Sequence, residues 1–114
     1  MKKAFVAQLS AALITVTLGM GVALAEDHKA EATQHALAAA ESGKKGDAAA
    51  VGEHAAAALT HAQAAQQEKA NPHLDAGVKN LKEAIEHAKM GHGDIAGEAA
   101  DAAATHLKAA EKSF

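Results

Sequence analysis

Between residues 28 and 112, apolar and alanine positions recur every three or four residues, which is the period of an α-helix. The clearest stripe has spacings of four, three, four and three and consists of Leu74, Val78, Leu81, Ile85 and Ala88. A second stripe along residues 48–69 is mainly alanine. Along residues 28–42, Leu37 is the only large apolar residue. Alanine is the best helix former, and alternating strand patterns are nearly absent. The pattern therefore predicts an all-α protein.

Three segments interrupt the helical pattern and divide it into four helices. The first and third hold two glycines each and end in an aspartate, Asp47 or Asp94, that can cap the next helix. In the second segment, Asn71 can cap a helix that begins at Pro72. Because the connections are short, successive helices should be antiparallel, so we expect an up-down-up-down four-helix bundle of two helical hairpins. The predicted helices are 28–42, 48–69, 72–90 and 95–112.

An internal repeat supports the division into two hairpins. Gly52-Glu53 and Thr60-His61 recur 45 residues later as Gly97-Glu98 and Thr105-His106, each time among alanines. Part of this match follows from the alanine-rich composition, but the two dipeptides are more specific. The same helical unit is therefore predicted to occur twice.

The first 25 residues differ from the rest of the chain. Lys2 and Lys3 precede the mostly apolar stretch 4–22, and Ala23-Leu24-Ala25 forms a small-residue cleavage motif. We expect residues 1–25 to be a secretory signal peptide and residues 26–114 to be the mature domain, located in the periplasm without stable membrane insertion. An uncleaved N-terminal anchor is the alternative.

Composition excludes several classes of protein. The 114 residues include no Cys, which excludes disulfide frameworks, thiol catalysis and cysteine-based metal or haem sites. A formal net charge of −3 argues against nucleic acid as a partner. The sequence holds no Glu-x-x-His or His-Glu-x-x-His motif and no glycine-rich phosphate loop, so we do not expect an enzyme.

The mature chain has few large apolar side chains with which to build a core. We count eleven: Leu37, Val51, Leu59, Leu74, Val78, Leu81, Ile85, Met90, Ile95, Leu107 and Phe114. Each contributes about 1.5–3 kcal/mol when fully buried. We therefore expect a slender, marginally stable bundle that a ligand could stiffen.

Eight histidines carry the candidate chemistry. They fall into pairs separated by 7 or 14 residues: His28 and His35, His54 and His61, His73 and His87, His92 and His106. Seven residues are almost two helical turns, so the members of a pair share one side of their helix. They are also about 10.5 Å apart along the axis, whereas a metal–imidazole bond is only about 2.0–2.1 Å. One pair cannot chelate an ion alone, so further donors must come from carboxylates, a facing helix or another molecule.

Nearby side chains offer such donors. Glu31 lies between His28 and His35 at helical spacing, and Glu83 precedes His87 by four residues. His54 and His61 flank the apolar stripe of their helix, where a neighbouring helix could meet them. Met90, close to His87 and His92, could favour Cu(I) through its thioether. The predicted metal ligands are His28, Glu31, His35, His54, His61, His73, Glu83, His87, His92 and His106.

A single histidine of this kind is more often a surface or core-edge residue, but the heptad spacing of eight favours metal ligation. The Irving–Williams order places Cu(II) first for such nitrogen and oxygen donors, ahead of Ni(II) and Zn(II). The alternative hypothesis is a structural or interaction bundle of the cell envelope whose histidines sense acid. We expect metal ions as partners, and a monomer is one possible state.

These motifs resemble the small metal-binding protein (SmbP) family of periplasmic, histidine-rich four-helix bundles. The resemblance covers essentially the whole mature chain and rests on Gly52–Ala62, Asn71-Pro72-His73, Glu83–His87, Gly91-His92 and Thr105-His106-Leu107. It implies reversible binding of several divalent ions, copper foremost with nickel and zinc, for buffering, transport or detoxification. Four positions where the heptads of such proteins would carry histidine hold other residues here, which implies fewer or weaker sites: Ser42, Asp47, Asn80 and Ala99.

Overall fold

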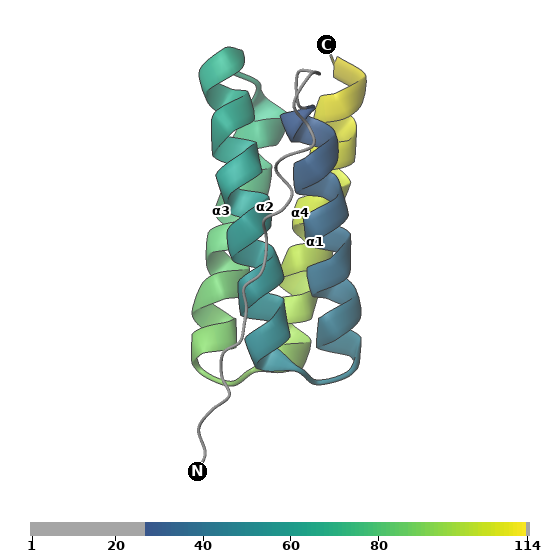
Figure 1. The fold of residues 1–114 in the computed structure, drawn as a ribbon, viewed down its shortest axis with the longest axis vertical. Helices are drawn as coiled ribbons and strands as arrows, with labels where there is room; N and C mark the ends of the chain where they lie inside the picture. Colours follow the sequence, from purple (N-terminus) through teal and green to yellow (C-terminus); the bar gives the residue numbers. More distant parts are fainter. Residues whose placement is uncertain (1–26, 114) are drawn as a thin grey trace, which may run out of the picture.

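A computed structural model describes residues 27–113, so the predicted signal segment and Phe114 lie outside the described residues. The described chain forms four helices: α1 (His28–Lys44), α2 (Ala48–Glu68), α3 (Pro72–Lys89) and α4 (Gly93–Ser113). Successive helices run in opposite directions, so the α1–α2 and α3–α4 loops lie at one end of the molecule and the α2–α3 loop at the other (Figure 1). The predicted all-α, up-down-up-down bundle is confirmed.

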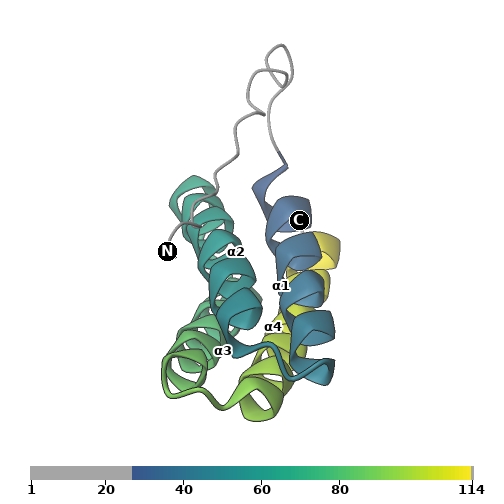
Figure 2. The same ribbon diagram turned by 60° about the horizontal axis from the view of Figure 1, so that its bottom comes forward.

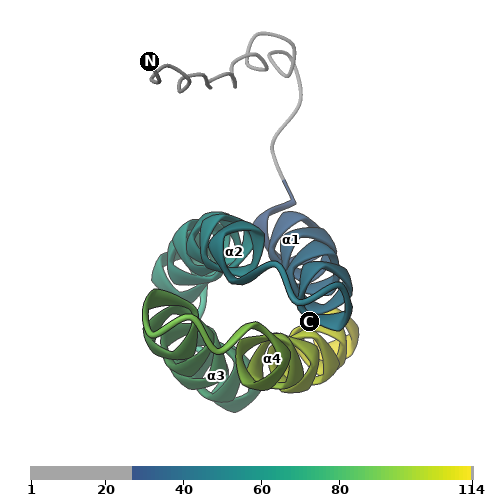
Figure 3. The same ribbon diagram turned by 90° about the horizontal axis from the view of Figure 1, so that it is seen from below.

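The four helices form a closed ring. Each helix packs against the next one in the chain, and α4 closes the ring by packing against α1. The view along the bundle shows this order directly (Figure 3), and a tilted view shows the loops of the two hairpins side by side at the same end (Figure 2). None of these four helices is long and apolar enough to cross a membrane.

Polar side chains begin three of the helices. The side chain of Asp27 accepts the N–H of Ala30 at the start of α1, and Asp47 accepts that of Ala50 at the start of α2. Asn71 accepts the N–H at the first turn of α3, with Pro72 in the first helical position. Each side chain satisfies a backbone N–H that has no partner within the helix. The predicted caps Asp47 and Asn71 are therefore confirmed.

Two helix ends differ from the prediction by two residues, and the others by at most one. Helix α1 continues through Gly43 to Lys44, and it ends where Gly46 takes a positive φ of 74°. Helix α4 begins at Gly93, so Asp94 lies inside the first turn and the prediction that it precedes the helix is wrong. The reason is packing, because a Cβ at Gly93 would lie 3.0 Å from the backbone of Gly46. The start of α4 meets the α1–α2 loop there, and a residue without a side chain fits at this first helical position.

The core is built mainly from alanine. Fourteen of the nineteen buried apolar residues are alanines, and the largest fully buried side chains are Leu74, Leu81, Leu107 and Val51. At one point the backbones of α1 and α4 approach closely, because a Cβ on Gly43 would lie 2.4 Å from the Cα of Gly97. The small inner side chains therefore allow the helices to pack closely together.

This close packing corrects the expected core. Leu37 is 37% exposed, Ile95 44% and Met90 57%. The inner face of α1 instead buries alanines, Thr33 and Gly43. Where α1 approaches its neighbours through alanine and glycine, the inner face is filled by small side chains, and Leu37 lies outside the core.

The packing also follows the 45-residue repeat. Gly52 of α2 lies against Ala88 of α3, and 45 residues later Gly97 of α4 lies against Gly43 of α1. Gly46 and Gly91, again 45 residues apart, end α1 and α3 with φ values of 74° and 80°. The α1–α2 and α3–α4 hairpins therefore place these glycine contacts and turns at equivalent positions.

Candidate metal site

Four histidines form a continuous row between α1 and α2, which we call the imidazole row: His28, His61, His35 and His54. Successive ring centroids are 5.2 Å apart for His28 and His61, 5.6 Å for His61 and His35, and 6.5 Å for His35 and His54. Residues from α1 and α2 alternate along this row. Two heptad-spaced pairs on adjacent antiparallel helices interdigitate in this way, as expected if His54 and His61 face a neighbouring helix.

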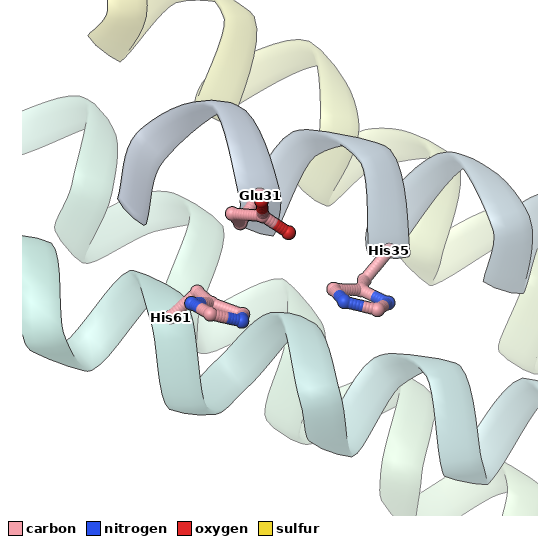
Figure 4. Close-up of side chains that lie close together, drawn as sticks. All are labelled: Glu31, His35 and His61. Atoms are coloured by element: carbon pink, nitrogen blue, oxygen red, sulfur yellow. The ribbon is translucent and has the colours of Figure 1, made fainter. Parts of the chain in front are cut away.

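Within the row, Glu31, His35 and His61 bring three metal-ligating groups together. One carboxylate oxygen and one nitrogen from each ring all lie within 4.8 Å of one another. Glu31 and His35 come from α1 and His61 faces them from α2 (Figure 4). With metal–ligand bonds of about 2.0–2.2 Å, two donors on one ion lie at most about 4 Å apart. Shifts of about 1 Å in the side chains would close the three donors around a single ion.

The environment of His35 favours the neutral form of its imidazole by lowering its pKa. Burial lowers the pKa of His35 below its ordinary value of 6.5, the neighbouring His61 and His54 also lower it, and Glu31 acts in the opposite direction. Only a neutral imidazole has a nitrogen lone pair for a metal. The His35 nitrogen is therefore available at a lower pH than that of a free histidine.

His28 lies beside this cluster, and its two ring nitrogens lie near polar groups of α2. Its Nδ1 is 3.0 Å from Nδ1 of His61, and its Nε2 is 3.8 Å from Oε2 of Glu68. Glu68 is absent from the predicted site residues. A signal for it exists, because Glu68 follows His61 by seven residues and so continues the heptad of His54 and His61.

The α3–α4 hairpin holds the other four histidines as two pairs. The rings of His73 and His106 are 6.2 Å apart, and each residue lies 45 positions after His28 or His61. The rings of His87 and His92 are 6.1 Å apart at the α3–α4 loop. Nδ1 of His87 is buried without a hydrogen-bond partner in the described chain. Each pair offers two imidazoles.

The structure does not gather all the predicted ligands. Among residues 27–113, Glu31, His35 and His61 are the only group of three or more such donors this close together. Glu31 thus joins one histidine of its own helix and one of the next helix, rather than His28 and His35 together. Glu83 is exposed on α3 and lies outside the group. The predicted ligands outside it are His28, His54, His73, Glu83, His87, His92 and His106.

Comparison with known proteins adds an independent finding. A family model described as small metal-binding protein matches residues 2–110, nearly the whole chain. A search of curated proteins found no match.

Proposed function

Because the chain belongs to the small metal-binding protein family, we propose that it reversibly binds Cu(II), and less tightly Ni(II) and Zn(II), as a metal buffer or carrier. The observation that carries the proposal is the convergence of Glu31, His35 and His61 from two helices. One carboxylate and two imidazoles form a mixed nitrogen and oxygen donor set, for which the Irving–Williams order favours copper over nickel and zinc.

The exposure of the cluster supports reversible binding. Glu31 is exposed and both imidazoles are half-buried, so solvent reaches the donors. Three protein donors leave coordination positions to water or to an acceptor molecule, as in metal sites that keep an open position. The ion is therefore cargo that can exchange with other molecules.

The remaining histidines supply weaker positions in this proposal. The pairs His73–His106 and His87–His92 each offer two imidazoles to an ion that completes its shell with water. His54 lies at the end of the imidazole row and can bind an ion together with His35. Glu83 can add a carboxylate near His87 at helical spacing.

The periplasm is the proposed location, supported by the signal-like segment at residues 1–25. Separation of periplasm from cytoplasm, followed by N-terminal sequencing of the recovered protein, tests this part. Recovery in the periplasm with an N-terminus near Glu26 is expected. Recovery of the full-length chain in the cytoplasm would contradict the location but not the metal binding.

Calorimetric titration of the purified protein with Cu(II), Ni(II) and Zn(II) tests the site. We expect copper to bind most tightly, and E31Q, H35Q and H61Q each to weaken the tightest Cu(II) site by about tenfold or more. E41Q is the matched control, since Glu41 is an exposed carboxylate on the same helix outside the cluster. The proposed site is rejected if the three variants bind copper as tightly as E41Q does.

A further inference from the structure

His28 contacts a ring of the proposed metal site but lies outside the cluster of donors. Its Nδ1 is 3.0 Å from Nδ1 of His61, which is hydrogen-bonding distance for two ring nitrogens. Its Nε2 faces the carboxylate of Glu68 at 3.8 Å. Glu68, His28 and His61 thus form a spatial series of contacts. His61 is the member of this series that also lies close to Glu31 and His35.

The nitrogen that His61 offers to an ion follows from this contact. Nδ1 of His61 is engaged by His28, which leaves Nε2 as the donor. Figure 4 shows one ring nitrogen of His61 directed toward the side of His35 and the other directed away from it. A neutral imidazole carries one proton, so a His61 that ligates through Nε2 carries it on Nδ1.

The positions of the ring protons can then be assigned for His61 and His28. Nδ1–H of His61 donates to Nδ1 of His28, so His28 carries its own proton on Nε2. That proton faces Oε2 of Glu68, a carboxylate with acceptor capacity only. The N–H of His61 has an acceptor at hydrogen-bonding distance, and the N–H of His28 faces a carboxylate at ion-pair distance. The position of one ring proton therefore determines the next.

We infer that His28 is a positioning residue for the proposed metal site, which orients His61 and selects its tautomer while Glu68 in turn orients His28. The inference rests on the proposed function. Ligating histidines commonly donate their second ring N–H to a hydrogen-bond acceptor such as a carboxylate or carbonyl, and loss of that acceptor typically costs about 10–100-fold in metal affinity. Nδ1 of His28 is the acceptor for His61. The sequence predicts His28 as a ligand, whereas this inference makes it a partner of the ligand His61.

The contacts of His28 argue against direct ligation. Both of its nitrogens face protein groups, Nδ1 toward His61 and Nε2 toward Glu68. Glu68 approaches from the Nε2 side, so its carboxylate does not converge with the two Nδ1 atoms on a common point. His61, in contrast, meets two further donors, Glu31 and His35.

The test compares H28A, H28Q and H35A in a background in which the four histidines of the α3–α4 hairpin are replaced by glutamine. Two quantities are measured with one equivalent of Cu(II): the affinity, by competition with a chelator, and the number of coordinated imidazoles, by electron spin echo spectroscopy. Circular dichroism verifies that each variant is helical.

We expect H28A to weaken copper binding by about 10–100-fold while two imidazoles remain coordinated, as in the parent. H28Q should recover part of the loss, because its amide oxygen can accept the N–H of His61. H35A should leave one coordinated imidazole. If H28A loses one coordinated imidazole, His28 is a ligand and the inference is overturned. If H28A binds copper with unchanged affinity, His28 does not position His61 and the inference is also overturned. Absence of coordinated imidazole in the parent would instead contradict the proposed function.

Discussion

The imidazole rings of His35 and His61 lie almost parallel, with 6° between their planes and 5.6 Å between their centroids, although they belong to different helices. An ion bound by both rings would cross-link α1 and α2. Because α1 also packs against α4 and α2 against α3, this cross-link would restrain the whole ring of helices.

Metal binding is therefore expected to stabilise the fold. At a free Cu(II) concentration 100 times the dissociation constant, the free energy of unfolding should rise by about 2.7 kcal/mol. For a domain of this size that corresponds to a Tm increase of about 10 to 20 °C. Thermal unfolding followed by circular dichroism measures it. The increase should be much smaller in H35Q/H61Q, and an equal increase in both proteins would show that copper acts elsewhere.

The repeat predicts that a second three-donor site can be built. The positions 45 residues after Glu31 and His35 are Ala76 and Asn80, while His106 already corresponds to His61. The double substitution A76E/N80H should therefore complete a cluster between α3 and α4 and add one tight Cu(II) equivalent in calorimetry. A76E alone is the control and should add none, because it leaves Asn80 in place. An unchanged stoichiometry in the double variant would show that the hairpins differ in geometry.

The lowered pKa of His35 predicts acid-sensitive stability. Burial, with His61 and His54, keeps this pKa below 6.5 in the folded chain. Well above pH 6.5, His35 is neutral in both the folded and the unfolded state. Below it, the unfolded chain binds the proton first, so the contribution of His35 to stability is lost as the pH falls toward the lowered pKa. Urea unfolding of the metal-free protein between pH 7.5 and 5 should show this decrease, and H35Q should show a smaller one. Equal slopes would contradict the assignment to His35.

The close approach of α1 and α4 predicts a large effect of one methyl group. In G97A the new Cβ would lie 2.7 Å from the Cα of Gly43, and backbone atoms cannot move aside as a side chain can. We expect a loss of about 1–3 kcal/mol in the free energy of unfolding. The equivalent substitution G52A meets only the Cβ of Ala88, at 3.3 Å, and gains helix propensity. Its stability should stay within about 1 kcal/mol of the parent. Denaturant titration of both variants tests the difference, and equal stability would contradict it.

Much of the fold could be predicted from local properties. Alanine-rich segments with a helical period, interrupted by glycine and capped by Asp47 and Asn71, indicate four helices, and the observed ends differ by at most two residues. Short loops then require antiparallel neighbours. The misplaced start at Asp94 had a tertiary cause, since the contact between Gly93 and the backbone of Gly46 joins two separate loops.

The candidate site was only partly predictable. Heptad spacing identified the face of each helix that carries histidine, and it named Glu31, His35 and His61 among ten candidates. It did not show that Glu31 would share its cluster with a residue of α2. Glu83 and His87 have the same local spacing as Glu31 and His35, yet no third donor of the described chain joins them.

By itself, the sequence determined the helices, their order and the faces on which the imidazoles lie, because these depend on propensity and on a period of 3.6 residues. Only the tertiary structure decided which imidazoles lie close together, which carboxylate joins them in the cluster and which histidine lies beside the cluster. Those outcomes depend on the axial offset between α1 and α2, which alanine and glycine contacts throughout the bundle set together. Equal spacing along the chain therefore produced unequal surroundings for His28, His35 and His61.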